Sequence, residues 1–131
     1  MFLLLTTLTA TAGTTVSVGS LSVDGLEVRD LSCNLEKGGL LASAMVVGAL
    51  AAQKSALDAC APEGGAWRAS WTWSGGALTD LTIPSASAPD KNACIEGALR
   101  AVTSDLVGTC EATLLVGDLA AAEAAAATLQ K

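Results

Sequence analysis

The stretch that decides the fold runs from Lys54 to Val102 and reads KSALDACAPEGGAWRASWTWSGGALTDLTIPSASAPDKNACIEGALRAV. Its pattern predicts the end of one helix, a β-hairpin and a second helix, with a cysteine at each helical flank. The remainder of the chain is expected to pack onto this unit.

The first strand of the hairpin alternates strictly between apolar and polar residues. One face carries Trp67, Ala69, Trp71 and Trp73, and the other carries Arg68, Ser70 and Thr72. Three tryptophans on one strand can form a ligand-binding platform. In a chain with one Phe and no Tyr, however, Trp67, Trp71 and Trp73 are better interpreted as the bulk of the core.

The return strand is expected to run from Ala77 to Ile83. Ser74, Gly75 and Gly76 supply a tight turn. Strict alternation then points Leu81 and Ile83 toward the core, Asp80 and Thr82 toward solvent, and leaves the apolar Leu78 on the outer face.

Upstream, residues 14–35 predict two short strands, or one strand interrupted by a bulge. Leu26 and Val28 share one register, and Leu31 and Cys33 share the other, so the alternation breaks at Asp30. Residues 40–60 follow as one long helix, since apolar residues recur there at helical spacing. Its apolar part is too short to cross a bilayer, which takes about 20 residues.

Downstream, a Ser/Pro-rich loop leads to Asp90, a good N-cap for a helix from Lys91 to Thr103. Residues 110–116 alternate as a final strand. Residues 119–131 are rich in alanine and helical by propensity, with little to bury. The fold predicted is α+β: a small antiparallel sheet, made of the tryptophan-rich hairpin with early and final strands, and two helices packed on one face.

Composition excludes several classes of function. The net charge of −6 over 131 residues offers no basic patch, so a nucleic-acid partner is not expected. The absence of histidine removes the commonest general base and zinc ligand. Nucleophile-elbow, phosphate-binding and dinucleotide-binding motifs are missing, and no cofactor or metal is predicted. Four acidic residues are interpreted as a solvated face rather than a calcium site: Asp24, Glu27, Asp30 and Glu36.

The first residues resemble a short secretory leader. An apolar run, Phe2–Leu5, is followed by the small residues Ala10–Gly13, typical of a cleavage site. The expected organisation is a leader over 1–13, a single disulfide-stapled domain over 14–118 and an Ala-rich tail over 119–131. No lipid anchor and no membrane span in the mature chain are expected.

The four cysteines are Cys33, Cys60, Cys94 and Cys110, and none belongs to a C-x-x-C pair. This spacing disfavours a redox or zinc motif and favours disulfides. The coarse fold chooses among the three connectivities, because Cys60 and Cys94 flank the hairpin on helices whereas Cys33 and Cys110 lie on strands. We therefore expect Cys60–Cys94 and Cys33–Cys110, in a periplasmic or secreted protein. The alternative is four reduced cysteines in the cytosol.

The order of these elements resembles the carboxy-terminal domain type of the periplasmic proteins TonB and TolA. In particular it is similar to the AgmX/PglI type found in myxobacterial envelope proteins. The similarity covers about half the chain and lies in the turn Gly75–Leu78 and the helix start Cys94–Leu99, read as C-I-x-x-A-L. It implies the fold and the compartment more than an energy-coupling role, since the spacer and the aromatic-proline helix end of such domains are missing.

Two classes of function follow from these observations. The first is a non-catalytic module of the bacterial cell envelope that binds another envelope protein, because domains of this type can offer an edge strand. The alternative is a small periplasmic enzyme based on a thiol or a carboxylate. The first is our prediction, with no catalytic residue; the identity of the partner and the oligomeric state do not follow from the sequence.

Overall fold

The computed structural model describes residues 13–36 and 39–129. In chain order its elements are β1 (Thr14–Val23), β2 (Leu26–Leu35), the 3-10 turn η2 (Gly39–Leu41), α1 (Ala42–Ala51), α2 (Lys54–Cys60), β3 (Gly65–Ser74), β4 (Leu78–Ala86), the 3-10 turn η3 (Pro89–Lys91), α3 (Asn92–Arg100), β5 (Val107–Val116) and α4 (Leu119–Thr128).

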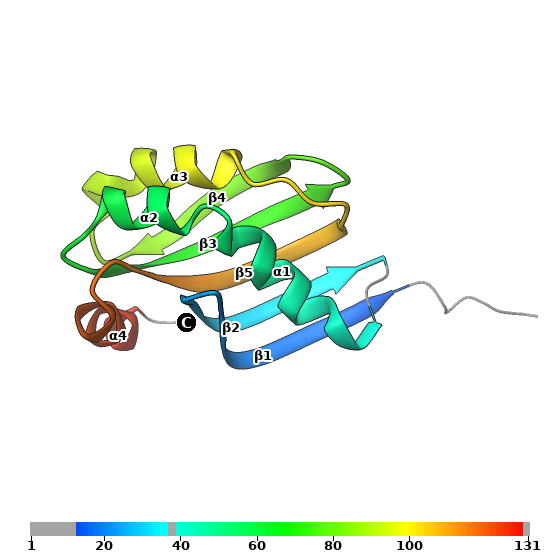
Figure 1. Ribbon diagram of the computed structural model, residues 1–131, viewed down its shortest axis with the longest axis horizontal. Helices are drawn as coiled ribbons and strands as arrows, with labels where there is room; N and C mark the ends of the chain where they lie inside the picture. Colours follow the sequence, from blue (N-terminus) through cyan, green and yellow to red (C-terminus); the bar gives the residue numbers. More distant parts are fainter. Residues whose placement is uncertain (1–12, 37–38, 130–131) are drawn as a thin grey trace, which may run out of the picture.

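The strands form one antiparallel sheet in the order β1-β2-β5-β3-β4 (Figure 1). The α+β class and the small antiparallel sheet predicted from the sequence are confirmed. The last strand, β5, occupies the middle of the sheet. The hairpin β3–β4 forms one half and the hairpin β1–β2 forms the other, so β1 and β4 are its two edges.

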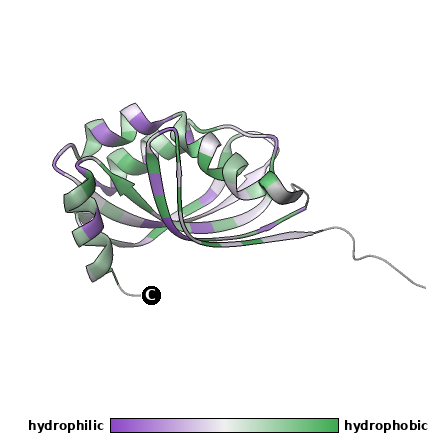
Figure 2. Ribbon diagram, turned by 60° about the horizontal axis from the view of Figure 1, so that its bottom comes forward, coloured by the Kyte–Doolittle hydropathy of each residue, from purple (hydrophilic) through white to green (hydrophobic). Residues whose placement is uncertain are grey.

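One face of the sheet carries the main core. Helix α1 lies over β1 and β2, whereas α2 and α3 pack on each other over the β3–β4 half (Figures 1 and 2). The side chains that meet between the sheet and the helices include Val28, Leu50, Trp67 and Leu99, all fully buried.

The opposite face is covered at one end by α4, which contacts β3 and β5. Ala122 of α4 is buried, as are Ala66 of β3 and Leu115 of β5. Ala66 and Leu115 pair directly and alternate with the core residues of their strands, so α4 lies on the other side of the sheet from α1. The Ala-rich segment therefore does bury residues, at a small second interface.

The expectation of one helix over residues 40–60 is wrong. Helix α1 ends at Ala51 and α2 begins at Lys54. Gln53, between them, has φ −105° and ψ 17°, outside helical values. The break lets α1 follow the β1–β2 half while α2 turns toward α3. The following helix is also shorter than expected, spanning Asn92–Arg100 rather than 91–103.

A β-bulge at Asp30 explains the broken alternation in β2. Arg29 pairs with Thr113, but the next aligned pair is Ser32 with Glu111, so Asp30 and Leu31 together oppose Ala112. Asp30 has a φ of +51°, a conformation that Asp tolerates better than most residues. Residues 14–35 therefore form two strands, β1 and β2, and the second of them contains a bulge.

The expectation that Leu78 lies on the outer face is wrong, because β4 also contains a β-bulge. Leu78 is 5% exposed and belongs to the core. Strand β4 shifts register twice against β3, the first time between Thr79 and Thr82, where Asp80 has a φ of +52°. The bulge inverts the alternation, so Leu78 and Leu81 point to the same face.

Candidate binding surfaces

The three tryptophans proposed as core or binding face lie in the core. Trp67 and Trp73 are fully buried and Trp71 is 2% exposed. The rings of Trp71 and Trp73 meet edge to face, with centroids 6.0 Å apart, a favourable arrangement for aromatic pairs. No part of this face is accessible to a ligand, so the strand serves packing.

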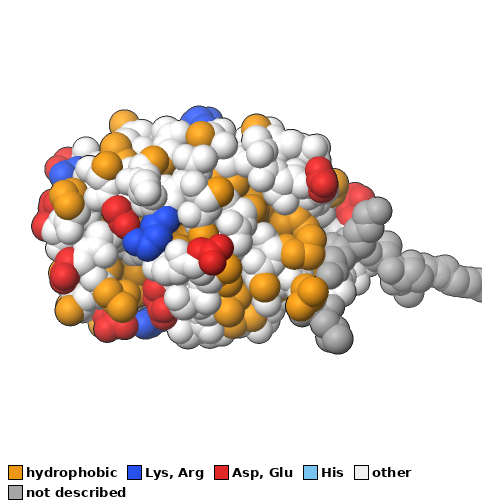
Figure 3. Space-filling model, in the orientation of Figure 1, with side chains coloured by type: hydrophobic (Ala, Val, Ile, Leu, Met, Phe, Trp, Pro, Cys, Tyr) orange, Lys and Arg blue, Asp and Glu red, His pale blue; other side chains and the backbone are white. Residues whose placement is uncertain are grey.

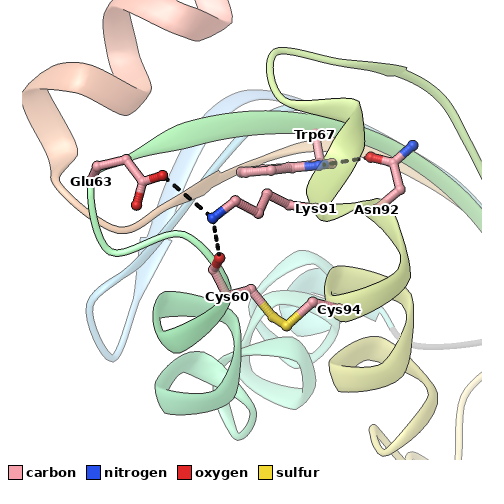
Figure 4. Close-up of a disulfide and its surroundings, with 6 residues drawn as sticks. All are labelled: Cys60, Glu63, Trp67, Lys91, Asn92 and Cys94. Atoms are coloured by element: carbon pink, nitrogen blue, oxygen red, sulfur yellow. Dashed lines mark hydrogen bonds and ion pairs between the residues drawn. A yellow bond between two sulfur atoms is a disulfide. The ribbon is translucent and has the colours of Figure 1, made fainter.

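Figure 4 shows how Trp67 is tied to the helices around the first disulfide. Its indole Nε1 donates to Oδ1 of Asn92 at 3.0 Å, and Cys60 at the end of α2 is bonded to Cys94 of α3, with Cα atoms 5.7 Å apart. Lys91 Nζ donates to the carbonyl oxygen of Cys60 at 3.2 Å and approaches Glu63 Oε2 at 3.5 Å. This arrangement fixes α2 against α3.

Glu63 is exposed, and its contribution to stability comes mainly from the charge of its carboxylate. Its pKa lies below the ordinary value, first because its carboxylate accepts a hydrogen bond from its own backbone N–H and second because it faces Lys91. The carboxylate therefore favours folding above its unfolded-state pKa, and this contribution disappears as the pH falls through the lower folded-state value.

The second disulfide joins Cys33 of β2 to Cys110 of β5, with Cα atoms 4.1 Å apart. These residues are direct partners in the antiparallel ladder, so the bond crosses adjacent strands at the centre of the sheet. Both disulfides match the nested pairing expected from the sequence, and no cysteine is free. Two disulfides are typical of proteins that fold in an oxidising compartment.

The described residues contain no cluster suited to a metal ion. Within 13–36 and 39–129, no group of three or more Cys, Asp and Glu side chains is placed to hold a metal ion. Asp24, Glu27, Asp30 and Glu36 are distributed along the β1–β2 turn and β2 rather than gathered, and Glu27 pairs with Arg29. Within the described ranges, no helix is long and apolar enough to cross a membrane.

The open face of the sheet is polar and organised by two arginines. Arg29 contacts Glu27 and also Glu123 of α4, at 2.9 and 3.1 Å. Its pKa is raised, mainly by the hydrogen bond to Glu27, and an arginine side chain stays protonated in proteins in any case. Beside it a hollow of about 270 Å³ lies between the sheet and α4, with Gly19, Thr113 and Leu129 among its lining residues.

Arg68 closes the bulge of β2 from the neighbouring half of the sheet. Its Nη1 donates to the carbonyl oxygen of Asp30 at 3.0 Å and to Thr113 Oγ1 at 3.3 Å, and its Nη2 lies 3.3 Å from Glu111 Oε2. The guanidinium therefore gives the carbonyl of the bulged residue Asp30 a charged donor.

We predict that Arg68→Ala lowers the free energy of unfolding by about 1–3 kcal/mol, because the Asp30 carbonyl loses a charged donor. Arg100→Ala is the matched control, since Arg100 is 57% exposed and, among the residues that the structure describes, pairs only with Glu96 of its own helix. Its effect should stay below about 0.5 kcal/mol. Urea denaturation measures both. Equal effects of the two substitutions would contradict this role of Arg68.

The two edges of the sheet differ in how well they are protected against pairing with another strand. The edge strand β4 carries Asp80, Pro84 and two register shifts, all of which discourage pairing. The edge strand β1, TTVSVGSLSV, is ten residues long and has no charged residue and no proline. Among the described residues it pairs only with β2. Strand β1 is the unprotected edge.

The helix above this edge is also uncharged. From Gly39 to Gln53 there is no Asp, Glu, Lys or Arg, and α1 is apolar on all sides. Leu41 and Met45 are 69% and 46% exposed. In Figure 3 the surface over α1 is orange and white; most of the charged side chains in this view lie toward the left, and some acidic ones lie at the right. An apolar surface helix is typical of a contact region.

Comparison with known proteins identifies no relative: no protein-family model matches the chain, and no curated protein and no solved structure matches it either. The function therefore has to be argued from the surfaces described above.

The sequence contains a local signal for the β1–β2 hairpin, though not for its position at the edge of the sheet. Asp24 and Gly25 have φ angles of +50° and +86° and form the two-residue turn between β1 and β2. Asp-Gly between alternating segments is a strong hairpin signal. That hairpin, with β5 in the middle of the sheet, leaves β1 as an edge.

Proposed function

We propose that this protein is a non-catalytic module that binds another protein of the cell envelope in the periplasm or outside the cell, and that β1 is its binding strand. The observation that carries the proposal is the difference between the two sheet edges: β4 is protected by bulges, Asp80 and Pro84, and β1 is not.

An extended segment of the partner would add to β1 through main-chain hydrogen bonds, as a sixth strand. On the helix side it would meet the half-buried side chains of Val18, Leu21 and Val23, so we expect apolar residues at alternate positions of the partner. On the open face it would meet Ser17 and Ser22, which are exposed. Sequence specificity would come from these alternating contacts.

The resemblance to the TonB and TolA type of periplasmic domain is part of this proposal, because domains of this type can offer an edge strand to a partner. The disulfides support an exported location. The alternative is a small periplasmic enzyme based on a thiol or a carboxylate; its thiol form would need a free cysteine, and all four cysteines are in disulfides.

The proposal is tested by a photo-crosslinking amino acid placed at Ser17 in β1 or, as the matched control, at Thr82 in β4. Both positions are exposed on edge strands. Irradiation of cells that export the protein should give a discrete protein adduct from position 17 and none from position 82. Adducts from position 82 alone, or from neither position, would refute the assignment of β1.

A further inference from the structure

We infer that the strand received by β1 is β1 of a second copy, so that two sheets join across a two-fold axis. This inference rests on the proposed role of β1 as the binding strand and names a second copy as its occupant, in place of a different envelope protein. Two observations support it. The order of inward-facing and outward-facing residues along β1 is symmetric about the middle of the strand, and the surface around β1 carries little charge.

The face pattern of β1 inverts at its middle. Val16 and Val18 pack toward the core, and beyond Gly19 the inward residues are Leu21 and Val23. Strand β1 stays in register with β2 throughout, from Thr14 opposite Leu35 to Val23 opposite Leu26, so it follows the inversion that β2 makes at Asp30. The even-numbered residues face the helices before Gly19 and the odd-numbered residues face them after it.

This inversion makes β1 complementary to itself in one central register. An antiparallel copy centred between Gly19 and Ser20 places Val16 opposite Val23 and Val18 opposite Leu21, so that inward apolar residues meet inward apolar residues. Ser17 then lies opposite Ser22 on the open face. Residues that are directly opposite in antiparallel strands point to the same side of the sheet. The apolar pairs and the Ser17–Ser22 pair are therefore matched in kind, and at the centre Ser20 lies opposite Gly19, which has no side chain to oppose it.

The surrounding charges also favour a second copy. The chain carries a net charge of −6, so two copies repel each other over most orientations. Strand β1 and helix α1 form the surface where this repulsion is weakest, since neither contains a charged residue. A two-fold axis perpendicular to the sheet puts both α1 helices, which lie over β1 and β2, on the same side of the junction.

The first test is the mass of the purified protein by sedimentation velocity over a wide concentration range. The wild-type chain should approach twice the mass of one chain as the concentration rises. Ser17→Lys should remain monomeric, because lysine on an edge strand opposes pairing. Thr82→Lys, the matched change on β4, should associate like wild type. A wild type that stays monomeric, or loss of association in both variants, overturns the inference.

The second test fixes the register. Ser17→Cys and Ser22→Cys chains are prepared separately, mixed and mildly oxidised. Directly opposed residues have Cα atoms about 4.5–5.5 Å apart, within disulfide range, whereas the two copies of residue 17 would lie about 17 Å apart, five residues along the strands. The mixture should cross-link and either variant alone should not. Equal cross-linking of Ser17→Cys alone overturns the register.

The two proposals fail separately. If the wild type is monomeric while a cross-linker at Ser17 captures a different protein, the second copy is excluded and β1 remains the binding strand. If neither association nor cross-linking occurs at Ser17, both proposals fall.

Discussion

Trp71→Ala is expected to lower the free energy of unfolding by about 3–5 kcal/mol, the usual cost of removing a large aromatic side chain from a packed core. Trp71 is 2% exposed, contacts Trp73 edge to face and lies opposite Cys110 in the ladder of β3 and β5. The cavity would therefore open at the centre of the sheet. Chemical denaturation followed by circular dichroism measures the loss.

Phenylalanine substitutions separate packing from hydrogen bonding at the same strand. The indole N–H of Trp71 is buried without a partner among the described residues, whereas that of Trp67 donates to Asn92. Trp67→Phe and Trp71→Phe remove the same volume. Trp67→Phe should be more destabilising by about 1 kcal/mol, because only this change loses a hydrogen bond.

Free quenching of the native tryptophan fluorescence by iodide would contradict the burial of all three rings.

Removal of the Cys33–Cys110 disulfide by a double alanine substitution is expected to cost about 4.5 kcal/mol in the chain-entropy model, because the closed loop spans 77 residues. The Cys60–Cys94 disulfide closes 34 residues, which corresponds to about 3.8 kcal/mol. Both losses are large against the stability of a small domain, and thermal unfolding of the two double variants measures them.

Graded reduction tests whether the two disulfides differ in their exposure to solvent. Cys33 and Cys110 are each 2% exposed, whereas Cys94 lies on the exposed surface of α3. A reductant should therefore open Cys60–Cys94 first while Cys33–Cys110 persists, as peptide mapping of alkylated samples would show. Simultaneous reduction of both bonds in the folded protein would contradict the difference in burial.

The sequence was sufficient for the elements that have a strong local signal. The period-2 tryptophans of β3, the broken alternation at Asp30 and the positions of the four cysteines each correspond to what the structure contains. These features share a simple cause. Burial of one face, or a covalent bond, leaves a pattern in consecutive residues.

Other features depend on tertiary context and left no such pattern. The helix break at Gln53 has neither Gly nor Pro beside it and follows from the need of α1 and α2 to cover different halves of a twisted sheet. The burial of Leu78 depends on a bulge at Asp80 that strict alternation cannot reveal.

The candidate binding strand could not be assigned from sequence because being an edge is a property of strand order. Residues 14–23 read as an ordinary half-buried strand. Only the insertion of β5 between β2 and β3 places β1 at the outside of the sheet. At an edge, the absence of charged residues leaves β1 open to pairing with another strand, whereas in a central strand it would have no such consequence.

The assignment of β1 as the binding strand is tested most directly by amide hydrogen exchange. The protein recovered from its native compartment with its bound partner, whether a second copy or another protein, is compared with the dilute purified chain. We predict that the amides of β1 exchange more slowly in the bound sample and that those of β4 do not change, because only β1 gains main-chain hydrogen bonds. Protection of β4 with unchanged exchange in β1 would contradict the assignment.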